Sequence, residues 1–115
     1  MCNRYKSIKE WQELVHTLAK SKGWWKHYNK PFSIQVSNFH SEISEVWEEY
    51  RNGRKMDEIY ISPGGKPEGI PIELADTVIR IMDTCERYGI NLERAMRLKF
   101  AYNATRPYKH GGKKA

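Results

Sequence analysis

Two pairs of acidic residues with the same spacing are the part of the sequence best suited to chemistry. Glu42 and Glu45 are three residues apart. Glu73 and Asp76 repeat that spacing further along the chain. Positions three apart on a helix project from one side, so each pair offers two neighbouring carboxylates. Carboxylates gathered in low dielectric need a cation to compensate their charge, and oxygen ligands alone favour Mg²⁺, with Mn²⁺ as a substitute. The four predicted metal ligands are Glu42, Glu45, Glu73 and Asp76.

Two other interpretations of the acidic residues remain open at this point. A single E-x-x-E pair is common on helices and usually marks a solvated face, although here both pairs border apolar stripes. A di-iron bundle is the second alternative, because Glu13-x-x-His16 has half of its signature. That fold needs Glu-x-x-His twice, and the sequence contains it once. We therefore expect His16 to be an ordinary histidine at the surface or the edge of the core.

Hydrophobic periodicity and capping residues predict four helices that position these acids. Ser7 is the expected N-cap of the first helix, with Glu10 completing a capping box. A serine, Ser33 or Ser37, is expected to start the second helix, and Pro71 suits the first turn of the third. The predicted ranges are 7–22, 33 or 37 to 53, and 71–88, and the fourth helix is expected to begin after Asn91 as N-cap and to continue to about residue 104. The fold class is therefore all-α, a four-helix bundle with a long irregular loop over 53–69, in which Ile59-Tyr60-Ile61 could form a short strand.

The bulk properties indicate one small domain over residues 1–115. The net charge is +6, which favours an anionic partner, and the end of the chain from about 105 to 115 is predicted to be a basic tail that folds over a substrate or is flexible. No apolar run is long enough for a membrane span, and no secretory signal is recognisable, so a cytoplasmic protein with reduced Cys2 and Cys85 is expected. The third helix is apolar on most of its circumference, which predicts a homo-oligomer.

Three segments together resemble the MazG-like all-α nucleoside triphosphate pyrophosphohydrolases. They are SEISEVWEEYRNG, GIPIELADTVIRIMD and GINLERAMRLKFAYNATRPYKHGGK. The family pattern is E-x-x-E, a variable spacer and E-x-x-D, and the resemblance extends from about residue 18 to 113. It implies Mg²⁺-dependent hydrolysis of a nucleoside triphosphate, for which we expect a dNTP, to the monophosphate and pyrophosphate, in cleansing or regulating the nucleotide pool. It also implies a homodimer or homotetramer, with the four acids as metal ligands.

The resemblance further suggests roles for residues around the acids. Glu45 or Glu49 would activate water, because both share the stripe that faces the metal. Arg80 lies one turn beyond Asp76, and either neutralises a carboxylate or contacts a phosphate. The remaining candidates for substrate binding are Trp24 and Trp25, of which one is expected to stack on the base and the other to join the core, and Lys99, Asn103 and Arg106, spaced i, i+4, i+7 as donors to phosphate.

Two functions of other classes compete with hydrolysis. The first is a non-catalytic, basic helical module that binds nucleic acid or a protein partner. The acidic stripes would repel a duplex, so nucleic acid is not the partner we expect. The second is a fold of the MazG type that has lost activity and serves as a scaffold, although all four acids are present.

Overall fold

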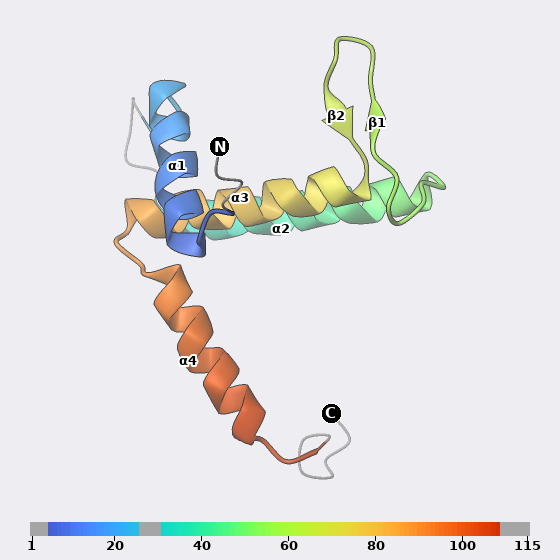
Figure 1. Ribbon diagram of the computed structural model, residues 1–115. Coiled ribbons are helices and arrows are strands. Elements are labelled where there is room, and N and C mark those ends of the chain that lie inside the picture. The colour runs from blue at the N-terminus through green and yellow to red at the C-terminus, as the bar shows by residue number, and fades with distance from the viewer. Residues whose placement is uncertain (1–4, 26–30, 109–115) are drawn as a thin grey trace.

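A computed structural model describes residues 5–25 and 31–108, and the described chain is mostly helical. Its elements in order are α1 (Ile8–Ser21), α2 (Phe32–Arg51), β1 (Tyr60–Ile61), β2 (Pro67–Glu68), α3 (Ile70–Arg87) and α4 (Leu92–Thr105). α2 and α3 lie side by side, α1 crosses the second half of α3, and α4 projects away from the other three helices (Figure 1). The all-α fold class is confirmed. No helix of the described chain has the length and apolar character needed to cross a membrane.

The ends of the helices follow their capping residues. The predicted capping box of α1 is confirmed, since the Ser7 hydroxyl accepts from the Glu10 N–H and the Glu10 carboxylate accepts from the Ser7 N–H. Asn91 caps α4 in the same way, through a bond from the Arg94 N–H to its side chain. The predicted start of α2 near Ser33 lies one residue from the observed start, and the alternative start at Ser37 is wrong. α2 begins at Phe32 after Pro31, whose backbone is extended and which supplies no side-chain cap.

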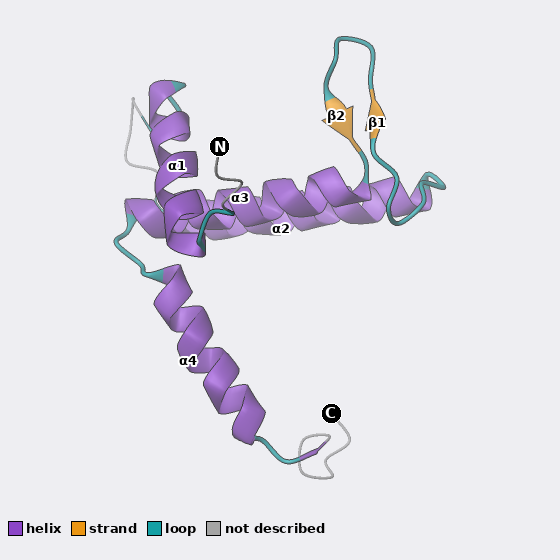
Figure 2. Cartoon of the chain, viewed as in Figure 1, coloured by secondary structure: helices purple, strands orange, loops and turns teal. Residues whose placement is uncertain are grey.

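The predicted irregular loop contains a short hairpin that leads into α3 (Figure 2). β1 and β2 pair antiparallel, with Tyr60 opposite Glu68 and Ile61 opposite Pro67, so the expected strand is confirmed at these positions. Gly69 follows with a φ of 126°, a conformation that favours glycine. A Cβ atom there would collide with the carbonyl oxygen of Glu58. The close approach fixes where α3 begins.

The buried core of the described chain is small. Its apolar members are Val15 and Ala19 from α1 and Ile70, Met82 and Cys85 from α3. The radius of gyration is 17.3 Å, whereas a compact domain of this length has one of about 13 Å. α4 projects away from the other helices, and none of its residues is buried. The single chain therefore leaves apolar surface uncovered.

Candidate metal centre and adjoining cavity

The four predicted metal ligands come together between α2 and α3. One carboxylate oxygen from each of Glu42, Glu45, Glu73 and Asp76 lies within 4.8 Å of the others. α2 supplies the first pair and α3 the second, and the side-by-side packing of these helices brings the pairs face to face. Glu42 and Glu73 are buried and Glu45 is exposed. The cluster therefore has a buried floor and one edge open to solvent.

The buried members of the cluster hold protons more tightly than ordinary carboxyl groups. Burial raises the pKa of Glu42 from 4.5 to about 7, and the neighbouring Asp76 adds to the shift while the charge of Arg80 opposes it. Burial also raises the pKa of Glu73 to about 7, with Glu45 as the next cause. Two carboxylates cannot donate hydrogen bonds to each other, so their proximity is repulsive unless a proton or a cation compensates it.

One unsatisfied carboxylate oxygen indicates that a cation fits the cluster. The Oε2 atom of Glu42 is buried and accepts no hydrogen bond. The Nε atom of Arg80 is 2.8 Å from Oε1 of Glu42. The N–H does not form a hydrogen bond to that oxygen, so the contact is an ion pair only. A buried carboxylate oxygen without a partner carries a cost that a metal ion would remove. The donors are all oxygens, and they suit Mg²⁺ or Mn²⁺.

Glu49, the second candidate for activating water, is held by the hairpin. The hydroxyl of Tyr60 lies 3.0 Å from each of its carboxylate oxygens. The guanidinium of Arg54 stacks over the Tyr60 ring at 3.6 Å. Glu49 is absent from the group of four acids whose oxygens converge. This geometry makes Glu45, which is exposed and within the cluster, the better placed of the two candidates.

A cavity of about 340 Å³ adjoins the cluster, and Arg80 belongs to both. The side chains that line it are Trp24, Trp25, Gln35, Asn38, Arg80 and Asp83. Arg80 lies over the ring of Trp24 at 5.5 Å, and Trp24 is 52% exposed. An aromatic face, two amides and a guanidinium can hold a flat polar group by stacking and hydrogen bonds.

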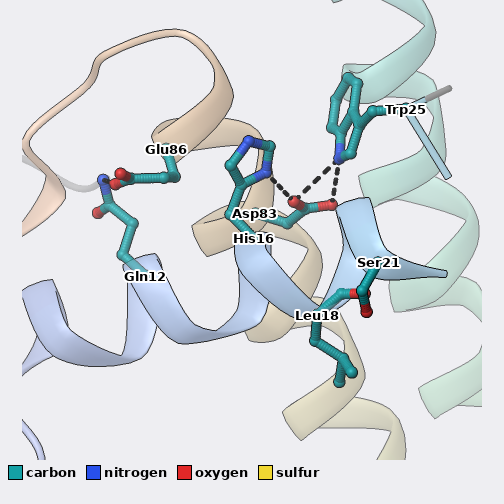
Figure 3. A network of polar contacts seen from close by, with 7 residues as sticks. All are labelled: Gln12, His16, Leu18, Ser21, Trp25, Asp83 and Glu86. Carbon is teal, nitrogen blue, oxygen red and sulfur yellow. Dashed lines mark hydrogen bonds and ion pairs between the residues drawn. The ribbon is translucent and has the colours of Figure 1, made fainter. Parts of the chain in front are cut away.

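A buried carboxylate positions the second tryptophan (Figure 3). The indole Nε1 of Trp25 donates to both oxygens of Asp83, at 3.1 and 3.2 Å. The Nδ1 atom of His16 is 2.6 Å from Oδ1 of the same carboxylate. His16 is buried and pairs with Asp83, so it does not stand beside the four acids, as a di-iron ligand would. Of the two tryptophans, Trp25 is therefore tied to the interior and Trp24 is open to the cavity.

The structure does not bring the basic residues of α4 to the acids of the same chain. Lys99 and Asn103 are exposed on a helix whose main packing partner among the described elements is α1. Arg106 caps the far end of that helix. Figure 1 shows α4 leading away from the α2–α3 pair. The expected tail at 105–115 lies outside the described residues from Lys109 onwards.

Sequence reasoning missed three residues of the cavity, namely Gln35, Asn38 and Asp83. Gln35 and Asn38 are three apart, on the side of α2 that continues toward Glu42 and Glu45. Their position on the same face of α2 as the acids could have predicted that they belong to the site, because polar side chains on a buried face need a hydrogen-bonding partner. Asp83 continues the polar stripe of α3, but its pairing with His16 depends on how α1 crosses α3. Local spacing does not carry that information.

No family model matches the sequence, and neither a curated protein nor a solved structure matches it. The resemblance to the MazG-like enzymes therefore stays an expectation drawn from the motifs.

Proposed function

We propose that the protein is a Mg²⁺-dependent hydrolase that cleaves a nucleoside triphosphate to the monophosphate and pyrophosphate. The observation that carries the proposal is the convergence of four carboxylates from two helices within 4.8 Å, beside a cavity with an aromatic wall. We also propose that the chain has the four-helix fold of these pyrophosphohydrolases and forms a homodimer or homotetramer. We expect the substrate to be a dNTP.

Different residues of the chain would bind the metal and accept the proton in such a reaction. Glu42, Glu73, Asp76 and Glu45 would hold the metal, which supplies charge compensation for the phosphates and lowers the pKa of bound water. Glu45 lies at the open edge of the cluster, where its carboxylate can accept the proton of an attacking water. Water adds to phosphorus, and the bond to the pyrophosphate leaving group breaks, so that one water is consumed for each triphosphate.

Arg80 supports the placement of a nucleotide across the two parts of the site. Its guanidinium reaches Glu42 on one side and the Trp24 ring on the other. A metal bound by Glu42 would compete with Arg80 for that carboxylate and would free the guanidinium for a phosphate oxygen. The base would then stack on Trp24 within the cavity.

The experiment is an assay of pyrophosphate release from a panel of NTPs and dNTPs, with Mg²⁺, with Mn²⁺ and with EDTA. The proposal expects release from at least one dNTP, dependence on the metal and a monophosphate as the second product. Absence of turnover across the panel would overturn it. Binding to a DNA or RNA duplex that weakens steeply with salt and ignores Mg²⁺ would favour the non-catalytic basic module instead.

A further inference from the structure

The cavity beside the metal centre has a buried polar wall that the proposed hydrolysis leaves without a role. Two of its lining residues are almost fully buried, Gln35 from α2 at 7% exposed and Asp83 from α3 at 8% exposed. Trp24 also lines the cavity and is 52% exposed, so it marks the side that is open to solvent. A flat group that enters past Trp24 therefore meets Gln35 and Asp83 at the buried wall.

The amide of Gln35 offers a hydrogen-bond donor to this cavity. Its Nε2 atom is buried and donates to no acceptor among the described residues. A buried N–H without an acceptor is destabilising, because the group has lost its hydrogen bonds to water. A ligand that brings a carbonyl oxygen or a ring nitrogen into the cavity would supply the missing acceptor. The unsatisfied amide therefore points to ligand binding at this wall.

The carboxylate of Asp83 offers an acceptor whose orientation is fixed. Its Oδ1 atom lies 2.6 Å from Nδ1 of His16 and accepts from Nε1 of Trp25 at 3.1 Å (Figure 3). Among the described residues, Oδ2 receives only the longer bond from the same indole, at 3.2 Å. A carboxylate has about four acceptor positions, so Oδ2 retains one for an N–H of a ligand. His16 and Trp25 hold this acceptor in place before a ligand arrives.

A donor and an acceptor at one wall match a base edge in which an N–H lies beside a hydrogen-bond acceptor. The oxo bases guanine, uracil and thymine present a ring N–H next to a carbonyl oxygen. The amino bases adenine and cytosine present an exocyclic amino group next to a ring nitrogen. The ring N–H is the more acidic donor, and a hydrogen bond to a charged acceptor strengthens with the acidity of its donor. The carboxylate of Asp83 therefore favours the oxo bases.

We propose that the cavity selects oxo bases over amino bases, with Asp83 accepting the ring N–H and Gln35 donating to the adjacent carbonyl oxygen. The selection names the substrate class of the proposed hydrolysis and rests on that function. Both residues lie outside the four acids of the metal cluster, so they determine specificity and not the cleavage step. Asn38 lines the same cavity and offers a second amide to the polar atoms by which guanine differs from the pyrimidines.

Binding of deoxynucleoside monophosphates to the wild-type protein tests the selection without turnover. Tryptophan fluorescence in the presence of Mg²⁺ gives the dissociation constants of dGMP, dUMP, dTMP, dAMP and dCMP. We expect at least one oxo-base nucleotide to bind about tenfold more tightly than either amino-base nucleotide, as for the gain of one charge-assisted hydrogen bond. The order of dGMP against dUMP and dTMP separates a purine site from a pyrimidine site. Any result without a preference for an oxo base, including no binding, would overturn the proposal.

Methylation of the ring nitrogen gives a sharper comparison. 1-Methyl-dGMP and 3-methyl-dTMP keep the ring and its carbonyl groups but carry a methyl group in place of the N–H. The analogue of the preferred nucleotide should lose the preference, because the carboxylate of Asp83 then meets no donor. An analogue that binds as tightly as its parent would remove Asp83 from base recognition and contradict the proposal.

Gln35→Met separates recognition of the base from support of the fold. The substitution keeps the length of the side chain and removes an unsatisfied buried donor, so the Tm should stay level or rise. The affinity for the preferred nucleotide should nevertheless fall about tenfold. A fall in Tm with equal weakening for every nucleotide would show that Gln35 only supports the cavity wall, against the proposal.

Asp83→Asn tests the acceptor by replacing it with a donor. His16 and Trp25 lie closest to Oδ1, so the amide oxygen of the variant should take that position and its NH₂ group the position of Oδ2. That NH₂ group would face the ring N–H of an oxo base, so the preference should be lost or reversed. Asp57→Asn, at an exposed loop position, is the matched control and should keep the preference. Equal weakening for all bases in Asp83→Asn would indicate a structural role alone and overturn the proposal.

Pyrophosphate release from the matching triphosphates separates this inference from the proposed function. Faster release from dGTP, dUTP or dTTP than from dATP and dCTP would support both. Release mainly from dATP or dCTP would leave the hydrolysis standing and overturn the selection. No release from any triphosphate would reject the hydrolysis, while the affinities of the monophosphates still decide which bases the cavity selects.

Discussion

The Nε atom of Arg80 lies 2.8 Å from Oε1 of Glu42, so one cation of the protein already compensates part of the acidic cluster. Replacing Arg80 by Met should raise the pKa of Glu42 above its value of about 7, because the charge of Arg80 lowers that pKa. Titration of the glutamate carboxyl carbons by NMR measures the change. Arg51→Met is the control, since Arg51 pairs with the exposed Glu48. A titration of Glu42 that is the same in both variants would contradict the assignment.

Glu45→Gln should reduce pyrophosphate release by at least about a hundredfold, because the amide cannot take a proton from water and is a poor metal ligand. Helical circular dichroism should be preserved, since Glu45 is exposed. Glu48→Gln, three residues further along the same helix, is the matched control and should keep its activity. Turnover in Glu45→Gln equal to that of the control would remove Glu45 from the reaction.

The stability of the metal-free protein should fall as the pH rises from 4.5 to about 7. In that window the folded state holds more protons than the unfolded state, because the pKa values of Glu42 and Glu73 are raised on folding. Above it the curve should level off. Thermal melts in EDTA measure the trend, which the double variant Glu42→Gln/Glu73→Gln should lack.

Mg²⁺ should stabilise the protein more at about pH 8 than at about pH 5.5, because its ligands must be deprotonated. The difference between melting temperatures with Mg²⁺ and with EDTA gives the comparison. An equal gain at both pH values would mean that the ion binds away from Glu42 and Glu73.

Asp83→Ala should lower the free energy of unfolding by about 2 kcal/mol, since the Trp25 indole and the His16 ring lose their acceptor. Tryptophan emission should shift to the red in the folded variant as Trp25 loosens. Ser21→Ala removes one exposed bond to the carbonyl of Leu18 and serves as the control. A loss no larger than in that control would show that the network contributes little.

Trp24→Ala should raise KM for the nucleotide about tenfold with a smaller effect on kcat, as expected for the loss of one stacked base. Pyrophosphate has no base, so its inhibition constant should stay unchanged. A parallel loss of affinity for pyrophosphate would indicate that Trp24 supports the metal centre and not the base.

The acidic centre could be predicted because it depends on the spacing of residues that are close together in the sequence. Each acid pair is set by a three-residue spacing, and the apolar stripe beside it determines which side of the helix turns inward. The capping residues Ser7 and Asn91 were equally local, and both hold. The start of α2 at Phe32 lies one residue before the predicted Ser33, because Pro31 supplies the extended entry without a side-chain cap. The pairing of Asp83 with His16 and the direction of α4 depend on contacts between distant segments, which spacing does not encode.

The glycine at position 69 places a constraint on the sequence that no chemical role explains. Its carbonyl accepts the first-turn hydrogen bond from the Glu73 N–H at 3.0 Å, and its missing Cβ is what allows the hairpin to pass against it. In a saturation-mutagenesis map, position 69 should tolerate as few substitutions as the acids themselves. A selection for function would therefore mark as essential a residue that touches no substrate.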